Sequence, residues 1–107
     1  MKLNLALAQI ATKLGDVEAN LEKHLDFIKQ AKEQKADILV FPELSLTGYV
    51  LQDLVASVAH CPTDDDPVFK HLLKASNDLD LVIGFVDEDS RHRFFIASAY
   101  LSGGRVI

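Results

Sequence analysis

The 107-residue sequence predicts an α/β fold in which strands alternate with helices. Residues 3–10 alternate large apolar side chains with small or polar ones, which is typical of a strand. Apolar residues then recur at helical spacing over residues 17–34, with polar residues between them. Residues 38–41 are continuously apolar, as expected for a strand covered on both faces of a parallel sheet. The first part of the chain therefore predicts strand, helix and strand in that order.

Two aspartates mark the starts of the predicted helices. Asp16 precedes the first helix, where it can cap the free N–H groups or complement the positive end of the helix dipole. Asp66 is followed by Pro67, and this pair provides an N-cap and a first-turn proline for a second helix. The apolar residues that follow fall on one face, so this second helix is also predicted to be amphipathic.

The C-terminal part of the chain predicts a hairpin. Residues 79–86 form a second buried strand, with Gly84 expected at a close contact, and the charged residues 87–93 form a loop. Residues 94–101 form a strand that pairs antiparallel with its predecessor. A turn and the start of another strand follow at the end of the chain. Because domains seldom end inside such a strand, we expect residues 1–107 to be the N-terminal part of a single, longer domain.

Composition indicates an ordinary soluble globular protein. About half of the residues are apolar and a quarter are charged. The formal net charge is -5 and no basic stripe is present, which argues against nucleic acid or a negatively charged membrane surface as a partner. The N-terminus lacks the apolar region of a signal peptide, and no stretch approaches transmembrane length. We therefore expect a cytoplasmic location.

Cysteine and histidine patterns give no sign of a metal site. The single cysteine, Cys61, excludes an intrachain disulfide. It lies between two predicted helices and is expected to be inert, although His60 precedes it. The four histidines show no spacing that is typical of metal ligands, so we expect no metal and no cofactor.

Glu43 is the residue best placed for chemistry. It follows Pro42 directly after the strand at residues 38–41, and ligands of open α/β sheets bind beyond the carboxyl ends of the strands. A partly desolvated carboxylate at that point suits a general base. Alternatively, Pro42 and Glu43 open a short helix, with the glutamate favouring the helix dipole. On spacing alone, the helix start is the simpler explanation.

Residues 36–54 resemble the first catalytic motif of the nitrilase, or carbon–nitrogen hydrolase, superfamily. The elements that carry the resemblance occur in the family's order: a first strand, then Gly15-Asp16 and Asn20 at the head of the first helix, Ala36-Asp37-Ile38-Leu39-Val40-Phe41-Pro42-Glu43, and Thr47-Gly48-Tyr49. Further similarity through Leu81-Val82-Ile83-Gly84 extends the resemblance over essentially the whole chain.

The resemblance implies an αββα sandwich, of which this chain holds only the N-terminal portion, with helices packed on a mixed sheet. It implies that Glu43 is the general base of a Glu-Lys-Cys catalytic set and that Tyr49 lines the substrate pocket, although a packing role explains Tyr49 equally well. The lysine and the nucleophilic cysteine of the family lie beyond Ile107. The isolated chain is therefore expected to be inactive.

Three functions remain open at this point. The first is hydrolysis of a small linear amide, carbamoyl compound or nitrile by a protein that, like many members of the family, is expected to be a homodimer. The second is the glutaminase domain of a glutamine-dependent NAD synthetase, which Leu46-Thr47-Gly48-Tyr49 and Asp53-Leu54 resemble. The third is a catalytically silent interaction module.

Overall fold

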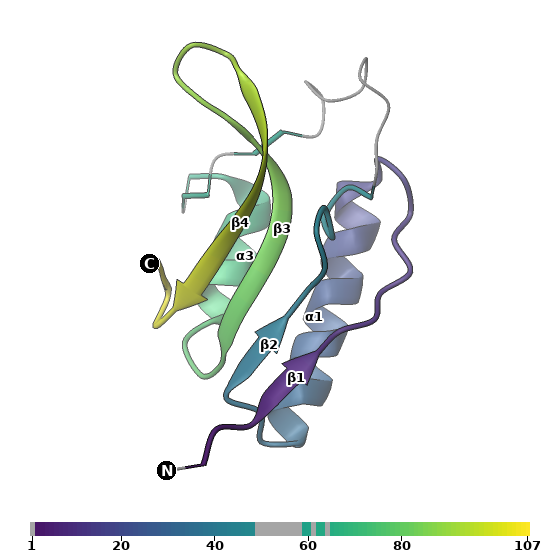
Figure 1. The fold of residues 1–107 in the computed structure, drawn as a ribbon, viewed down its shortest axis with the longest axis vertical. Coiled ribbons are helices and arrows are strands. Elements are labelled where there is room, and N and C mark those ends of the chain that lie inside the picture. Colours follow the sequence, from purple (N-terminus) through teal and green to yellow (C-terminus); the bar gives the residue numbers. More distant parts are fainter. Residues whose placement is uncertain (1, 49–58, 61, 64) are drawn as a thin grey trace.

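A computed structural model describes residues 2–48, 59–60, 62–63 and 65–107 as a sheet with helices on one face (Figure 1). Among these residues the sheet has five strands in the order β1-β2-β3-β4-β5. In chain order, the elements are β1 (Leu5–Leu7), α1 (Val17–Glu33), β2 (Ile38–Val40), α3 (Pro67–Ala75), β3 (Asp80–Glu88), β4 (Phe94–Ser102) and β5 (Arg105–Val106).

The sheet is mixed, as the sequence predicts. β1, β2 and β3 are parallel neighbours, and Leu39 of β2 lies between Ala6 of β1 and Leu81 of β3. β3 and β4 form an antiparallel hairpin, and β5 adds antiparallel to β4. Because parallel strands need a crossover, α1 connects β1 to β2 across one face of the sheet. The carboxyl ends of β1, β2 and β3 consequently meet at one edge.

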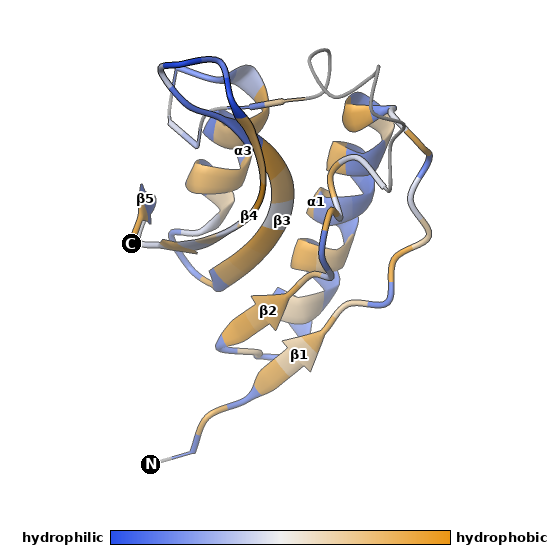
Figure 2. Ribbon diagram, turned by 45° about the horizontal axis from the view of Figure 1, so that its top comes forward, coloured by the Kyte–Doolittle hydropathy of each residue, from blue (hydrophilic) through white to orange (hydrophobic). Residues whose placement is uncertain are grey.

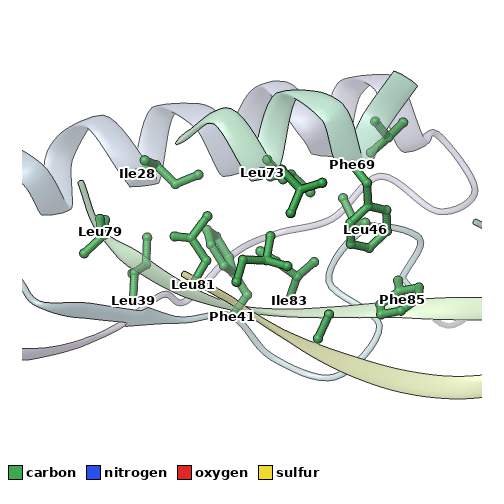
Figure 3. Close-up of a cluster of buried hydrophobic side chains, with 14 of the residues drawn as sticks. Ile28, Leu39, Phe41, Leu46, Phe69, Leu73, Leu79, Leu81, Ile83 and Phe85 are labelled. Carbon is green, nitrogen blue, oxygen red and sulfur yellow. The ribbon is translucent and has the colours of Figure 1, made fainter. Parts of the chain in front are cut away.

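The hydrophobic core lies between the helices and the sheet (Figure 3). Helices α1 and α3 lie over the same face, and the side chains that fill the space between the layers include Ile28 and Leu73 from the helices and Leu81 from β3. Phe69 of α3 meets Phe85 of β3 edge to face, with ring centroids 4.8 Å apart. The core thus fixes β3 against α3 along the length of the helix.

The opposite face of the sheet is also apolar. Figure 2 shows hydrophobic residues along the strands and a hydrophilic tip on the β3–β4 hairpin. Side chains alternate between the two faces of a strand, so Leu5, Leu7 and Ile96 point away from the helices. They are 57%, 75% and 63% exposed. The sheet therefore has a second apolar face, which neither α1 nor α3 covers.

Most predicted elements are confirmed within a residue or two. The helix expected at residues 17–34 is α1, and the strand expected at 94–101 is β4. The first strand is much shorter than residues 3–10, because β1 is an edge strand that pairs only with the three-residue β2. β3 extends two residues into the charged segment that was expected to be loop. Within the described part of the chain, no helix is long and apolar enough to cross a membrane.

Both predicted caps are present. Asp16 accepts a hydrogen bond from the backbone N–H of Ala19, at 3.0 Å. Asp66 uses Oδ1 to accept from the N–H groups of Val68 and Phe69, while its Oδ2 lies 2.6 Å from Nδ1 of His60. One carboxylate therefore starts α3 and also holds the segment that leads into it.

We predict that Asp66→Ala lowers the free energy of unfolding by about 1–2 kcal/mol, because two helix N–H groups lose their acceptor. Urea unfolding followed by circular dichroism measures the loss. The matched control is Asp65→Ala, which removes the same charge from an exposed neighbour and should change stability by less than about 0.5 kcal/mol. Equal effects of the two substitutions would contradict the capping role.

Candidate functional site

Glu43 lies where the sequence predicts it, just past the carboxyl end of β2. The parallel arrangement of β1, β2 and β3 brings the ends of these strands to the same edge, where α/β proteins bind ligands. Glu43 is exposed in the structure, whereas the sequence suggests partial burial. A cavity of about 250 Å³ adjoins it, lined by Ile10, Thr12, Pro42, Glu43, Leu44, Ser45 and Gly48.

Residues 43–48 form a compact turn, called the Glu43 turn below. Pro42 and Glu43 open no helix, so the alternative role suggested by spacing is wrong. The backbone N–H of Gly48 donates to the carbonyl of Leu44 at 2.7 Å. Gly48 has φ 71°, which suits glycine, but Leu44 has φ 54°, which is uncommon for a residue with a Cβ. The turn is therefore strained immediately after Glu43.

Gly84 of β3 allows the Glu43 turn to lie directly against the sheet. A Cβ atom at this position would be 2.5 Å from the backbone N of Leu44 and 2.5 Å from the carbonyl O of Pro42. The carbonyl of Gly84 accepts from the N–H of Leu46 at 3.1 Å. The close contact expected at Gly84 is thus confirmed, and its partner is the segment that carries Glu43.

His24 of α1 holds the turn from the other side. Its side chain is fully buried, with Nδ1 2.6 Å from the backbone carbonyl of Asn20 and Nε2 2.8 Å from Oγ of Ser45. A carbonyl only accepts hydrogen bonds, so Nδ1 carries the proton and Nε2 accepts from the Ser45 hydroxyl. The imidazole also stacks on Phe41, with centroids 4.1 Å apart and planes 28° apart.

Asn20 connects the turn to the loop before α1. Its side-chain amide N donates to the carbonyls of Lys13 and Leu46, each at 2.8 Å, and its Oδ1 accepts from the N–H of Lys13 at 2.7 Å. The N–H of Gly15 in the same loop donates to the carbonyl of Thr47 at 2.8 Å. The loop, the start of α1 and the Glu43 turn are therefore joined by a buried polar network.

Burial controls the charge of His24. Removal from water lowers the pKa of the imidazole to about 4, and the hydrogen bond to the Asn20 carbonyl offsets part of this effect. The ring is consequently neutral at pH 7, which agrees with its role as an acceptor for Ser45. Phe41 and Ser45, which the ring also contacts, carry no charge.

Sequence reasoning missed the role of His24. The sequence presents it only as a histidine without ligand spacing, yet Asn20, His24 and Ile28 recur every four residues on the buried face of α1. This spacing places His24 on the buried face of the helix, and it was the signal in the sequence from which burial of His24 could have been predicted. Tyr49, the predicted substrate-binding residue, and Cys61 lie outside the described residues. Among the residues that are described, no three His, Cys, Asp or Glu side chains gather in a way that could hold a metal ion.

Comparison with known sequences identifies relatives along nearly the whole chain. The family model for carbon–nitrogen hydrolases matches residues 4–102. The glutamine-dependent NAD(+) synthetase of Thermotoga maritima is 31% identical over 107 residues, which cover 99% of this chain and 18% of that protein. The synthetase of Aquifex aeolicus is 38% identical over 81 residues, covering 76% of this chain and 14% of that protein. The chain thus spans less than a fifth of these relatives.

Comparison with solved structures gives the same assignment of the fold. A glutamine-dependent NAD+ synthetase from Acinetobacter baumannii, solved with adenosine diphosphate, superposes with a TM-score of 0.78 at 29% identity over 100% of this chain and 20% of that one. An amidase from Nesterenkonia sp. superposes with a TM-score of 0.82 at 26% identity, over 98% of this chain and 40% of that one. The predicted α/β fold is confirmed as the N-terminal portion of a nitrilase-type domain.

We predict that Gly84→Ala lowers the free energy of unfolding by about 1–3 kcal/mol, because the added methyl group must displace backbone atoms of the Glu43 turn. Ser98→Ala is the control, since Ser98 lies opposite Gly84 on β4 and is exposed. Urea unfolding measures both variants. A Gly84→Ala variant as stable as Ser98→Ala would show that the turn does not lie against β3.

We predict that His24 makes stability depend on pH. The unfolded chain takes up a proton near pH 6.5 but the buried ring does not do so until about pH 4, so stability falls as the pH falls between these values. Between pH 7.5 and pH 5 the loss from this residue is about 2 kcal/mol. Comparing the urea midpoints of the wild type and His24→Gln over this pH range isolates the loss of stability that is due to His24.

His71→Gln is the control for this titration, because His71 is exposed. The control should keep the full pH dependence of the wild type, and His24→Gln should lose the part that belongs to His24. The same slope in all three proteins would contradict a buried, neutral His24.

Proposed function

Because the chain belongs to the carbon–nitrogen hydrolase family, we propose that residues 1–107 are the N-terminal part of an amidase domain in which Glu43 is the general base. The observation that carries this proposal is the position of Glu43. It lies at the carboxyl end of β2, and the buried contacts of its turn with β3 and α1 fix where the chain leaves the sheet. A base must be held in this way to act on a substrate at a fixed distance.

The chemistry proposed for Glu43 is proton transfer to and from a cysteine thiol. The family resemblance supplies a lysine and a nucleophilic cysteine from the part of the domain that follows Ile107. The carboxylate accepts the thiol proton, the thiolate attacks the amide carbon, and the proton is returned to the departing ammonia. Water then hydrolyses the thioester to give the acid and the free thiol. This sequence of steps requires no cofactor.

Similarity to the relatives supports glutamine as the substrate of this domain. The synthetases of Thermotoga maritima and Aquifex aeolicus are named as glutamine-dependent, and both exceed 30% identity over most of the chain. The segment Leu46-Thr47-Gly48-Tyr49 and the later Asp53-Leu54 also resemble this group. We therefore propose a glutaminase domain that releases ammonia for a synthetase domain elsewhere in the same protein.

A stand-alone hydrolase of small amides or nitriles is the second candidate. The amidase from Nesterenkonia sp. favours it, because this structure superposes with a TM-score of 0.82, slightly above the 0.78 of the synthetase from Acinetobacter baumannii. For either candidate we propose that Tyr49 lines the substrate pocket and that the protein is a cytoplasmic homodimer with no nucleic-acid partner. A parent protein without the lysine or the cysteine would instead be an interaction module.

The experiment that tests the proposal is Glu43→Gln in the complete protein that carries this domain. Loss of a general base should lower the rate of ammonia release from glutamine by about 10²–10⁴-fold. Glu33→Gln, an exposed glutamate at the end of α1, is the matched control and should leave the rate unchanged. An active Glu43→Gln protein would rule out the role of Glu43.

The same assay separates the two candidates. Rapid release of ammonia from glutamine, with little from simple linear amides or nitriles, supports the glutaminase. The opposite preference supports the stand-alone hydrolase and contradicts the assignment to the synthetase group.

A further inference from the structure

We propose that His24 is a positioning residue for Glu43 and that it acts through contacts on both sides of Glu43 along the chain. Its imidazole stacks on Phe41, two residues before Glu43, and accepts a hydrogen bond from Ser45, two residues after it. One buried side chain thus holds both ends of the segment that presents the carboxylate. The inference rests on the proposed function, because it gives the position of Glu43 a catalytic purpose.

The strained backbone at Leu44 is the reason that the Glu43 turn needs a residue to restrain it. Leu44 follows Glu43 directly and has φ 54°, a backbone conformation that crowds Cβ against the carbonyl oxygen. Residues in this conformation persist only where the surrounding structure holds them. Leu44 itself is buried and packs with Val86. If the contacts of the neighbouring Ser45 are lost, the turn can relax and the direction of Glu43 changes.

The geometry around Ser45 shows how His24 supplies the restraint. Its Oγ donates to Nε2 of His24 at 2.8 Å and accepts from the backbone N–H of Gly84 at 3.3 Å. The hydroxyl therefore joins α1 to β3 through the strained turn. The ring of His24 cannot rotate freely, because Nδ1 is bonded to the carbonyl of Asn20 in its own helix. The orientation of the imidazole is thus fixed before it contacts Ser45.

This role differs from that of Asn20. Asn20 bonds to the carbonyl of Leu46 and to Lys13, so it holds the far end of the turn and the loop before α1. His24 contacts both Phe41 and Ser45, on either side of Glu43, whereas Phe27, the other α1 ring near Phe41, meets Phe41 edge to face with centroids 6.3 Å apart. Substitution of His24 should therefore disturb the start of the turn more than the rest of α1.

Hydrogen exchange and carbon NMR test the proposal on the 107-residue chain. The exchange reporters are the amide of Leu46, which donates to the carbonyl of Gly84 in β3, and the amide of Gly48, which donates to the carbonyl of Leu44 within the turn. The NMR reporter is the side-chain carboxyl carbon of Glu43. In His24→Leu, loss of the buried hydrogen bond to Ser45 should speed exchange at both amides about tenfold relative to β3 amides. The Glu43 carboxyl resonance should shift as its surroundings change.

Matched variants separate positioning from a general loss of stability. Ser45→Ala should give part of the local acceleration of His24→Leu, because it removes the hydrogen bond to His24 but leaves the stacking on Phe41; the double variant should add little to His24→Leu, since both substitutions remove that hydrogen bond. His24→Gln should restore part of the protection, since its amide both donates and accepts. Ile28→Val, one turn along α1, should leave the ratio of turn to β3 exchange unchanged.

Unchanged relative exchange at Leu46 and Gly48 in Ser45→Ala, with an unshifted Glu43 carboxyl resonance, would overturn the proposal. This variant keeps the test valid where His24→Leu does not fold. None of the readouts depends on turnover. A negative result therefore leaves the role of Glu43 as a base untouched, and an inactive complete protein leaves the positioning result untouched.

Discussion

The hydrogen bond between Ser45 and His24 is the interaction on which the site depends. It joins α1 to the Glu43 turn, and the N–H of Gly84 extends the connection to β3. Every residue of this connection is buried, so each polar group has lost its water and needs a partner within the protein. A break at one point would leave buried donors or acceptors unpaired, and the turn that carries Glu43 would lose its support.

The network is stable because it is complete. Among the described residues, no buried side-chain nitrogen or oxygen atom lacks a hydrogen-bond partner. A fully satisfied polar network gives a core one preferred arrangement, whereas a partly satisfied network destabilises it. The neutral charge state of His24 belongs to the same arrangement, since its burial lowers the pKa and an uncharged Nε2 is the acceptor that Ser45 requires. Polar contacts and apolar packing therefore restrain the Glu43 turn together.

Local signals in the sequence predict much of this architecture. The caps Asp16 and Asp66, the periodicity of α1 and the apolar run of β2 are short-range features, and each of them is found in the structure. The position of Glu43 at the end of β2 follows from them. The network does not, because Ser45 is 21 residues from His24 and only the folded chain brings them together. Nothing local marks Leu44 as a residue with positive φ.

The central claim is that a neutral His24 accepts a hydrogen bond from Ser45 while donating one to Asn20. The most direct measurement is the ¹⁵N NMR spectrum of the His24 ring in the folded chain, which reports the protonation of each nitrogen. We predict a proton on Nδ1 and none on Nε2 at pH 7, with no change down to about pH 5. A charged imidazole at pH 7, or a proton on Nε2 instead of Nδ1, would contradict this account.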